Sequence, residues 1–367
     1  MSFKPELLTP EHIKRFEPYI PSKPVQELEK LYGVDKLHRL NNNENPLGPP
    51  AASGKVIDGF ITSEASIYPS GDAYYVKRKL ANKFGLHPEQ FLVGNGANEV
   101  ISFVIKAFCA EGDNIITADK TFAVYEWVAK FSGIEARLVP LKDFGFDDEA
   151  MLKKIDEHTK IIFICNPNNP TGSYWNKERL ISFLDAVGGS KIVVLDEAYI
   201  EFVEKEDFPN GMSLLNNYPN LVVFRTFSKM YALAGLRIGY LASSIEVVDI
   251  IRRTCIVYSV NTLAQAAAVA ALEDDEHVLH TLQVVRNGKN ILTEALDDME
   301  IPYINKEGNF MMIKSPINDS LAYRKLMGLG FMIRPMTSFR FPNYIRVTIS
   351  SGNIMTEFAD ALRKIFK

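Results

Sequence analysis

Six short apolar runs, most of them separated by helical patterns, limit the possible fold of this 367-residue chain more than any other feature. Runs of this length that are rich in Val, Ile, Leu and Phe are typical of strands buried on both faces. Helical patterns such as "NEVISFVIKAFCA" from Asn98 and "NKERLISFLDAV" from Asn176 lie between them. This repetition predicts an α/β fold with a mostly parallel sheet and helices on both faces. The predicted strands are "FLV" at 91, "NIITA" at 114, "ARLVPL" at 136, "KIIFIC" at 160, "KIVVLD" at 191 and "LVVF" at 221.

The pattern divides the chain into three parts. Residues 1–46 are rich in Pro and Asn, which predicts an irregular N-terminal arm. Residues 47–260 contain the alternating strands and helices, and we expect them to form the large domain. Residues 261–367 begin with a long helical stretch that we expect to break near Glu273–Glu276, and continue with short strands and a final helix. This last part predicts a smaller α+β C-terminal domain.

Charge and composition exclude several classes of function. A formal net charge of −4 gives no basic surface for nucleic acid. No apolar run approaches the ~20 residues that span a bilayer, and the N-terminus lacks the apolar core of a signal peptide. Cys109, Cys165 and Cys255 are widely spaced and have no histidine pair nearby, so we expect neither a disulfide framework nor a metal site. These features predict a cytoplasmic protein without a membrane partner.

Polar motifs follow the predicted strands at their carboxyl ends, where ligands bind in an open α/β sheet. They are "GNGANE" at 94, "NPNNPTG" at 166, "DEAY" at 196 and "RTFSK" at 225. The first is a weak dinucleotide fingerprint because Glu99 stands at the third glycine position, but its helix start would still present backbone amides to an anion. Each motif alone also fits an ordinary turn or helix cap. Their convergence on one crevice favours a ligand site.

One cofactor accounts for the whole set, because pyridoxal phosphate has a reactive aldehyde, a pyridine nitrogen and a phosphate. Lys229 would bind the aldehyde covalently, which explains a lysine at the end of a buried strand. Asp196 would keep the pyridine nitrogen protonated, and Asn169 and Tyr199 would hydrogen-bond the ring hydroxyl. The phosphate would be held by Thr226, Ser228, Arg237 and the backbone amides of Ala97 and Asn98.

With these residues in place, the chain resembles the class I/II aminotransferases, which are fold-type I pyridoxal-phosphate enzymes. The shared motifs run nearly from end to end in the family's order: "NNENPLGPP", "YPSGDAYYVKRKLANKFG", "GNGANE", "NPNNPTG", "DEAY" and "TFSKMYALAGLRIGY". Within this group, "PYIPSKPVQELEKLYG" and "FMIRPMTSFRFPNYIRVTIS" are similar to segments of the histidinol-phosphate aminotransferases. The resemblance implies a mostly parallel seven-stranded sheet in a large domain that binds pyridoxal phosphate.

The resemblance also implies further site residues. Phe122 would stack on the cofactor ring, where many relatives have a tyrosine. Tyr68 would reach the cofactor phosphate of a neighbouring subunit, which makes the active unit a homodimer. Tyr19 and Asn45 would line the substrate pocket. The substrate's carboxylate would bind Arg346 through a bidentate contact, and its phosphate or distal anion would bind Arg334.

Two departures from the family's pattern concern the substrate. Arg340 replaces what is usually a glycine, and "SSGN" at 350–353 replaces a run similar to "GTPEEN". Both positions are near the substrate arginines in the sequence. Arg340 would suit a strongly anionic substrate if it faces the pocket, and it has no such role if it points to solvent.

The activity implied by the resemblance is that of a pyridoxal-phosphate-dependent transaminase in histidine biosynthesis. It would move an amino group between glutamate and a small phosphorylated substrate, by preference histidinol phosphate with its carbonyl form imidazole-acetol phosphate. The alternatives are an aminotransferase for another phosphorylated ketone or an aromatic amino acid, a pyridoxal-phosphate-dependent decarboxylase of a phospho-amino acid, and a non-catalytic binding protein. The last is disfavoured because every expected catalytic position is filled.

Overall fold

The computed structural model describes residues 3–17, 23–60 and 63–366. Its largest sheet has seven strands in the order β2-β8-β7-β6-β5-β3-β4. Only β8 runs against the others, since it is antiparallel to both of its neighbours. The mostly parallel seven-stranded sheet is therefore confirmed. Its strands are β2 (Phe91–Gly94), β3 (Asn114–Ala118), β4 (Glu135–Val139), β5 (Thr159–Cys165), β6 (Ile192–Asp196), β7 (Leu221–Thr226) and β8 (Gly239–Ala242).

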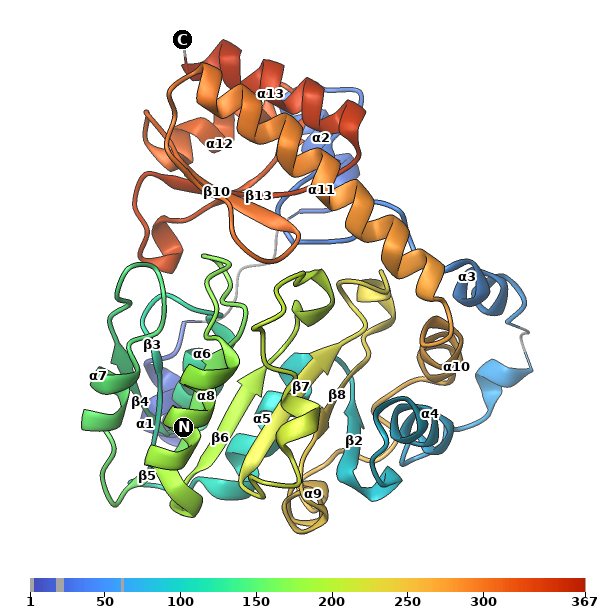
Figure 1. The fold of residues 1–367 in the computed structure, drawn as a ribbon, viewed down its shortest axis with the longest axis vertical. Helices are drawn as coiled ribbons and strands as arrows, with labels where there is room; N and C mark the ends of the chain where they lie inside the picture. Colours follow the sequence, from blue (N-terminus) through green and yellow to red (C-terminus); the bar gives the residue numbers. More distant parts are fainter. Residues whose placement is uncertain (1–2, 18–22, 61–62, 367) are drawn as a thin grey trace.

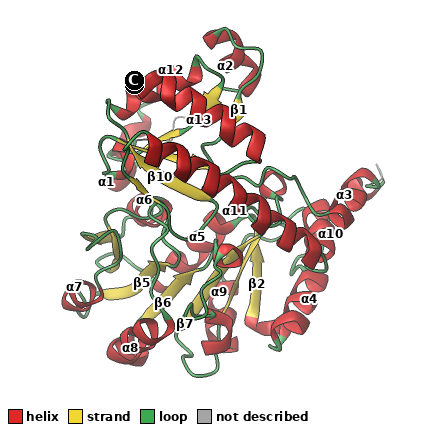
Figure 2. Ribbon diagram, turned by 45° about the horizontal axis from the view of Figure 1, so that its top comes forward, coloured by secondary structure: helices red, strands yellow, loops and turns green. Residues whose placement is uncertain are grey.

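Helices cover both faces of this sheet. The views in Figures 1 and 2 place α8 in front of the sheet and α5 behind it. The helix α5 contacts α6 and α9, while α8 contacts α7, so the two groups form separate layers. No helix in the described part of the chain is long and apolar enough to cross a membrane. The helices in the part of the chain that forms the large sheet are α3 (Ala51–Asp58), α4 (Tyr74–Phe84), α5 (Ala97–Phe108), α6 (Val124–Phe131), α7 (Asp148–Lys153), α8 (Lys177–Val187) and α9 (Ile245–Arg252).

A second, antiparallel sheet lies near the carboxyl terminus, with the order β12-β13-β10-β9. Figure 1 shows it beneath the long helix α11, which packs along α13. The expected break in the helical stretch is confirmed, because α10 ends at Ala271 and Asp274 caps the start of α11. The elements are α10 (Thr262–Ala271), α11 (Asp275–Asp298), β9 (Tyr303–Ile304), β10 (Phe310–Lys314), α12 (Asp319–Met327), β12 (Arg334–Pro335), β13 (Tyr344–Thr348) and α13 (Gly352–Phe366).

The N-terminal arm is more ordered than the sequence predicted. It contains a short helix, α1 (Glu11–Lys14), and a longer one, α2 (Val25–Tyr32). Leu28 of α2 packs into a small core with Leu37, Met327 and Met332. The strand β1 (His38–Arg39) then pairs in parallel with β11 (Phe331–Met332). The expectation of a wholly irregular arm was wrong, because distant apolar residues of the small domain give α2 a surface to bury.

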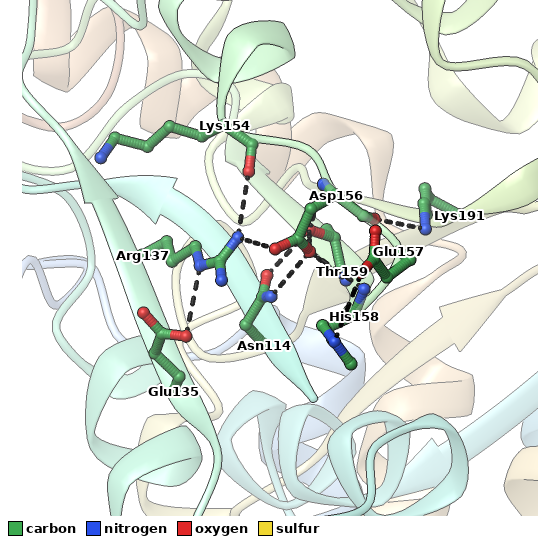
Figure 3. A network of polar contacts seen from close by, with 9 residues as sticks. All are labelled: Asn114, Glu135, Arg137, Lys154, Asp156, Glu157, His158, Thr159 and Lys191. Carbon is green, nitrogen blue, oxygen red and sulfur yellow. Dashed lines mark hydrogen bonds and ion pairs between the residues drawn. The ribbon is translucent and has the colours of Figure 1, made fainter. Parts of the chain in front are cut away.

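A polar network joins the amino ends of several strands, at the opposite end of the sheet from the predicted site (Figure 3). Asp156 accepts hydrogen bonds from Arg137 Nη1 at 2.5 Å, Asn114 Nδ2 at 3.1 Å and Thr159 Oγ1 at 3.0 Å. Its backbone carbonyl accepts one from Lys191 Nζ at 2.8 Å. These contacts lower the pKa of the Asp156 carboxyl, chiefly through the bond from Arg137. The network ties β3, β4, β5 and the start of β6 together and leaves the carboxyl ends free.

Candidate active site

The carboxyl ends of the large-sheet strands border a cavity of about 360 Å³, within the usual size range of small-molecule sites. Residues of β12 and β13 line its other side, so the cavity lies between the two sheets. Most of the predicted site residues, which come from separate motifs, meet here. The predicted residues that line the cavity are Ala97, Asn98, Phe122, Asn169, Asp196, Tyr199, Thr226, Ser228, Lys229, Arg237, Arg334 and Arg346.

Lys229 follows β7 and lies at the cavity wall. Its Nζ donates a hydrogen bond to the backbone carbonyl of Asn42 at 2.7 Å. Burial, and next the positive charge of Arg346, lower the pKa of Lys229 to about 7. A substantial share of neutral amine is therefore present near pH 7, and a neutral amine can attack an aldehyde or accept a proton.

Asp196 is the last residue of β6 and is 3% exposed. Its Oδ1 accepts a hydrogen bond from the backbone N–H of Ala198 at 3.0 Å, and its Oδ2 accepts one from the hydroxyl of Tyr125 at 2.5 Å. Burial raises the pKa of Asp196 to about 6, although these hydrogen bonds oppose the rise. A cationic ring nitrogen beside this carboxylate would favour the ionised form.

The start of α5 and the segment after β7 form an anion-binding end of the cavity. Gly96 caps α5, so the amides of Ala97 and Asn98 lie in the first turn, where N–H groups lack helical acceptors. Arg237 packs closely on this cap, because a Cβ atom at Gly96 would lie 2.3 Å from Nη2 of Arg237. Gly96 also has a φ of +81°, which favours glycine. The remaining groups at this end are the hydroxyls of Thr226 and Ser228.

Two arginines face the cavity from neighbouring strands. Arg334 of β12 and Arg346 of β13 are direct cross-strand partners. Arg346 donates to Asn169 Oδ1 at 2.5 Å and to the carbonyl of Asn41 at 2.7 Å, and Arg334 donates to Asn42 Oδ1 at 3.2 Å. The Nε atom of each is buried without a hydrogen-bond partner in the described structure. Because like charges placed opposite each other destabilise a sheet, this pair indicates a site for an anionic ligand.

The segment at 41–45 is placed differently from the expectation. Asn42, Asn43 and Glu44 line the cavity, whereas Asn45 does not. The side chain of Asn45 instead donates to the carbonyl of Met230, next to Lys229, at 2.8 Å. The motif "NNNENPLG" pointed to this segment, but only the structure shows which amides face inward. Asn43 also donates to the hydroxyl of Tyr199 at 2.9 Å.

Tyr68, another predicted site residue, does not line the cavity. Tyr68 is on the surface, 80% exposed, and its ring stacks on Tyr258 with the centroids 4.8 Å apart. Because Tyr68 is exposed, it is accessible to another subunit, and the expected contact stays a prediction. Tyr19 lies outside the described residues. The sequence reasoning also missed Phe339, which lines the cavity, and Tyr125, which lies in the first turn of α6, three residues after Phe122.

Arg340 points away from the cavity. Its Nη2 donates to both carboxylate oxygens of Glu126 at 3.0 Å, and its Nη1 donates to the carbonyl of Asp119 at 2.6 Å. Its φ of +62° explains why glycine would suit this turn. The run at 350–353 lies where β13 leads into α13, with Ser350 against Gly288 of α11, and it does not line the cavity. The hypothesis that Arg340 supplies an extra cation to the substrate is therefore wrong.

Arg340→Gly should change kcat/KM by no more than about twofold for any substrate, because it removes a half-exposed ion pair worth at most about 1 kcal/mol. Relief of the positive φ should offset part of that loss in thermal stability. Steady-state kinetics with each substrate and a thermal melt check both expectations. A loss restricted to phosphorylated substrates would return Arg340 to the substrate site.

The donors and acceptors around this cavity fit pyridoxal phosphate. The amine of Lys229 suits its aldehyde, the carboxylate of Asp196 suits its ring nitrogen, and the cap of α5 with Arg237 suits its phosphate. Enzymes that use this cofactor at the carboxyl end of such a sheet form the class called fold type I. The sheet order and the position of the lysine place the chain in that class.

Comparison with known proteins defines the family. Residues 35–362 match the family described as aminotransferase class I and II. The chain is 39% identical to histidinol-phosphate aminotransferase 2 of Pseudomonas fluorescens over 96% of both chains. It is 37% identical to histidinol-phosphate aminotransferase of Caldicellulosiruptor saccharolyticus over 97% of this chain and 99% of that protein. The chain therefore belongs to the aminotransferase class I and II family.

Solved structures support the same fold. The histidinol-phosphate aminotransferase of Sinorhizobium meliloti, solved in complex with pyridoxal-5'-phosphate, superposes with a TM-score of 0.86. It shares 24% sequence identity and covers 97% of each chain. The enzyme of the same name from Clostridium acetobutylicum superposes with a TM-score of 0.82 at 26% identity, over 90% of this chain and 99% of that chain. The arrangement of both sheets is thus shared with known aminotransferases.

Proposed function

We propose that this enzyme exchanges an amino group between glutamate and imidazole-acetol phosphate, the carbonyl form of histidinol phosphate, as a step of histidine biosynthesis. The observation that carries this proposal is the pair of guanidinium groups of Arg334 and Arg346 at the cavity wall, of which Arg346 is buried. Glutamate carries two carboxylates and histidinol phosphate carries a phosphate. A planar guanidinium binds either anion through paired hydrogen bonds, so the same two side chains suit both substrates. The relatives named for this activity support the choice of substrate.

The proposed roles of the residues follow from their contacts. Pyridoxal phosphate supplies an aldehyde that bonds to amines and a ring that accepts electrons from the substrate carbon. Lys229 would hold the aldehyde covalently, and its Nζ would serve as the general acid–base group for the substrate. Asp196 would keep the ring nitrogen protonated. Phe122 would cover the ring, and Asn169 and Tyr199 would hydrogen-bond its hydroxyl.

In this proposal, the phosphate of the cofactor and the substrate would bind at different ends of the cavity. Arg237, Thr226, Ser228 and the amides of Ala97 and Asn98 hold the cofactor phosphate. Arg346 and Arg334 hold the anionic groups of the substrate, and we propose that Asn45 acts indirectly by bracing the segment around Lys229. Tyr19 remains a proposed substrate contact on the basis of the family resemblance alone.

Half-reaction spectroscopy tests the activity. The purified enzyme should change its cofactor absorption when glutamate is added and should release 2-oxoglutarate. Histidinol phosphate should produce the same change, and aromatic amino acids or other phosphorylated amines should do so less efficiently. Release of carbon dioxide without 2-oxoglutarate would instead identify a decarboxylase.

Arg346→Lys should lower kcat/KM for both half-reactions by roughly 10- to 100-fold, since charged hydrogen bonds contribute about 1.5–3 kcal/mol each and an ammonium cannot reproduce the bidentate contact. Arg179→Lys is the matched control, because Arg179 pairs with Asp148 outside the cavity. Stopped-flow measurement of each half-reaction checks the effect. Equal behaviour of the two variants would remove Arg346 from the substrate site.

We also propose that the active unit is a homodimer in which Tyr68 reaches the cofactor phosphate of the neighbouring subunit. An exposed apolar patch supports this proposal, because Ile67, Tyr68, Ile256 and Val257 are each at least 60% exposed and lie around Tyr258. Apolar surface of this kind is typical of an interface.

We propose a cytoplasmic location as well, which the three free thiols support. The division of the chain into an arm (1–46), a large domain (47–260) and a small domain (261–367) is likewise a proposal.

Mixing Tyr68→Ala with Lys229→Ala should restore activity after subunit exchange. Each hybrid dimer would contain one site with both residues intact, so recovery should approach about a quarter of wild-type activity at equal mixing. Lys229→Ala mixed with Asp196→Asn is the control, because both residues belong to the same subunit's site and no hybrid site is intact. Without recovery despite proven exchange, Tyr68 does not act across the interface.

A further inference from the structure

The carboxylate of Asp196 is held at both oxygens by groups of the chain itself. The contact with Ala198 is local, because its backbone N–H is only two residues away. The contact with Tyr125 links Asp196 to α6, 71 residues earlier in the sequence. The hydroxyl of Tyr125 lies 2.5 Å from Oδ2, the distance of a strong hydrogen bond to an ionised acceptor. The orientation of the carboxylate therefore depends on a side chain outside its own turn.

Tyr125 is itself fixed by packing. Its side chain is fully buried, and its ring stacks on Phe163 with the centroids 4.7 Å apart and an interplanar angle of 16°. Phe122, the residue proposed to cover the cofactor ring, meets it edge to face at 5.6 Å. Burial, together with the charge of Asp196, raises the pKa of Tyr125 well above its usual value. Its hydroxyl thus remains a donor throughout the working pH range.

Of the groups that share the cavity with Asp196, Lys229 also changes charge near neutral pH, because its pKa is lowered to about 7. Burial raises the pKa of the Cys165 thiol and raises the pKa of Tyr199 to about 12, so both stay neutral. Glu197 is next in the sequence, and its carboxylate bonds to Arg225 at 2.7 Å and to the backbone N–H of Gly211 at 2.7 Å. Burial raises the pKa of Glu197, and the charge of Arg225 opposes this.

We propose that Tyr125 is a positioning residue for the reaction, whose hydroxyl orients the Asp196 carboxylate toward the cavity and keeps it ionised for the cofactor's ring nitrogen. Packing alone would need only the aromatic ring, and phenylalanine would then serve as well. The hydroxyl is needed only because Asp196 must stay charged in a buried site. This inference rests on the proposed role of Asp196 in binding the ring nitrogen.

The test compares Tyr125→Phe with wild type, using the affinity of the apoenzyme for pyridoxal phosphate across a pH series. In the wild type the affinity should fall as acid protonates Asp196. In Tyr125→Phe this fall should occur about one pH unit higher, because the lost hydrogen bond favoured the ionised carboxylate. The acid limb of kcat/KM should move in the same direction, and kcat should fall while KM for glutamate changes little.

Two further variants make the outcome decisive. Tyr218→Phe removes another tyrosine-to-aspartate bond, the 2.8 Å contact with Asp185 outside the cavity, and should leave both pH profiles unchanged. Asp196→Asn should remove the part of the affinity profile that Asp196 causes and leave the part that Lys229 causes, whose pKa is about 7. A variant that keeps the wild-type profile would refute the role of Asp196 itself. If Asp196→Asn changes the profile in this way but Tyr125→Phe matches wild type, or weakens affinity equally at every pH, Tyr125 only packs and the inference fails.

Discussion

Lys229→Ala should abolish turnover, with kcat lowered by roughly 10⁴-fold or more, because it removes both a covalent attachment and a general acid–base group. The residue is suited to both tasks, since its pKa is lowered to about 7 and its Nζ donates a hydrogen bond to a neutral backbone carbonyl, that of Asn42. Some cofactor should remain bound, because Arg237, Thr226 and the start of α5 do not depend on the lysine. Single-turnover assays with glutamate measure the loss.

Lys289→Ala is the matched control for this variant. Burial lowers the pKa of Lys289 to about 8, but the side chain donates to the carbonyl of Lys306, away from the cavity. Reduction with borohydride followed by peptide mass spectrometry should label Lys229 in the wild type and in the control, and no lysine in Lys229→Ala. Wild-type turnover of Lys229→Ala would overturn the assignment of the cofactor site.

The elements of the large sheet could be predicted from the sequence because each carries its own local signal. The strands β5, β6 and β7 are short apolar runs that become almost wholly buried. The helix α8 begins after Asn176, whose side chain accepts a hydrogen bond from the backbone of Arg179. The residues that end these strands then met in one cavity, because the carboxyl ends of parallel strands share an edge.

The features that the sequence did not reveal depend on contacts between distant segments. The helix α2 is stabilised by Met327 and Met332, about three hundred residues later in the chain. Tyr125 fits a core helix as well as a site, and only its distance to Asp196 distinguishes the two readings. The segment 41–45 contains four asparagines, and backbone geometry decides that Asn45 turns toward Met230 while Asn43 faces the cavity.

Arg340 illustrates the same limit at a position where the family's pattern is broken. A basic residue close in sequence to Arg334 and Arg346 suggested a role in binding anions. The turn instead directs the side chain toward α6, where Glu126 neutralises it. The pKa of the Glu126 carboxyl is lowered by Lys130 and Arg340 despite its partial burial. Charge near a site therefore predicts binding only when the direction of the side chain is known.

Asp196→Asn should lower kcat by roughly 10²–10³-fold or more, the size of effect seen when a fixed charge or donor is removed from a reacting centre. An amide is neutral, so it cannot hold the ring nitrogen in its protonated form. The substitution keeps the size of the side chain and an oxygen that can accept a hydrogen bond from Tyr125 or Ala198. The loss should therefore appear in kcat more than in folding, and half-reaction rates with glutamate measure it.

The same substitution should make the apoenzyme more stable at neutral pH. Burial raises the pKa of Asp196 to about 6 in the folded apoenzyme, while an unfolded aspartate has a pKa of about 4. The unfolded chain therefore releases this proton first as pH rises, so the wild-type carboxylate costs stability above about pH 4, and the cost is complete above about pH 6. Melting temperatures of apo wild type and apo Asp196→Asn should differ at pH 7.5 and converge near pH 4. A variant that is less active but no more stable at pH 7.5 would show that Asp196 is already ionised without cost in the empty site, through the hydrogen bonds from Tyr125 and Ala198.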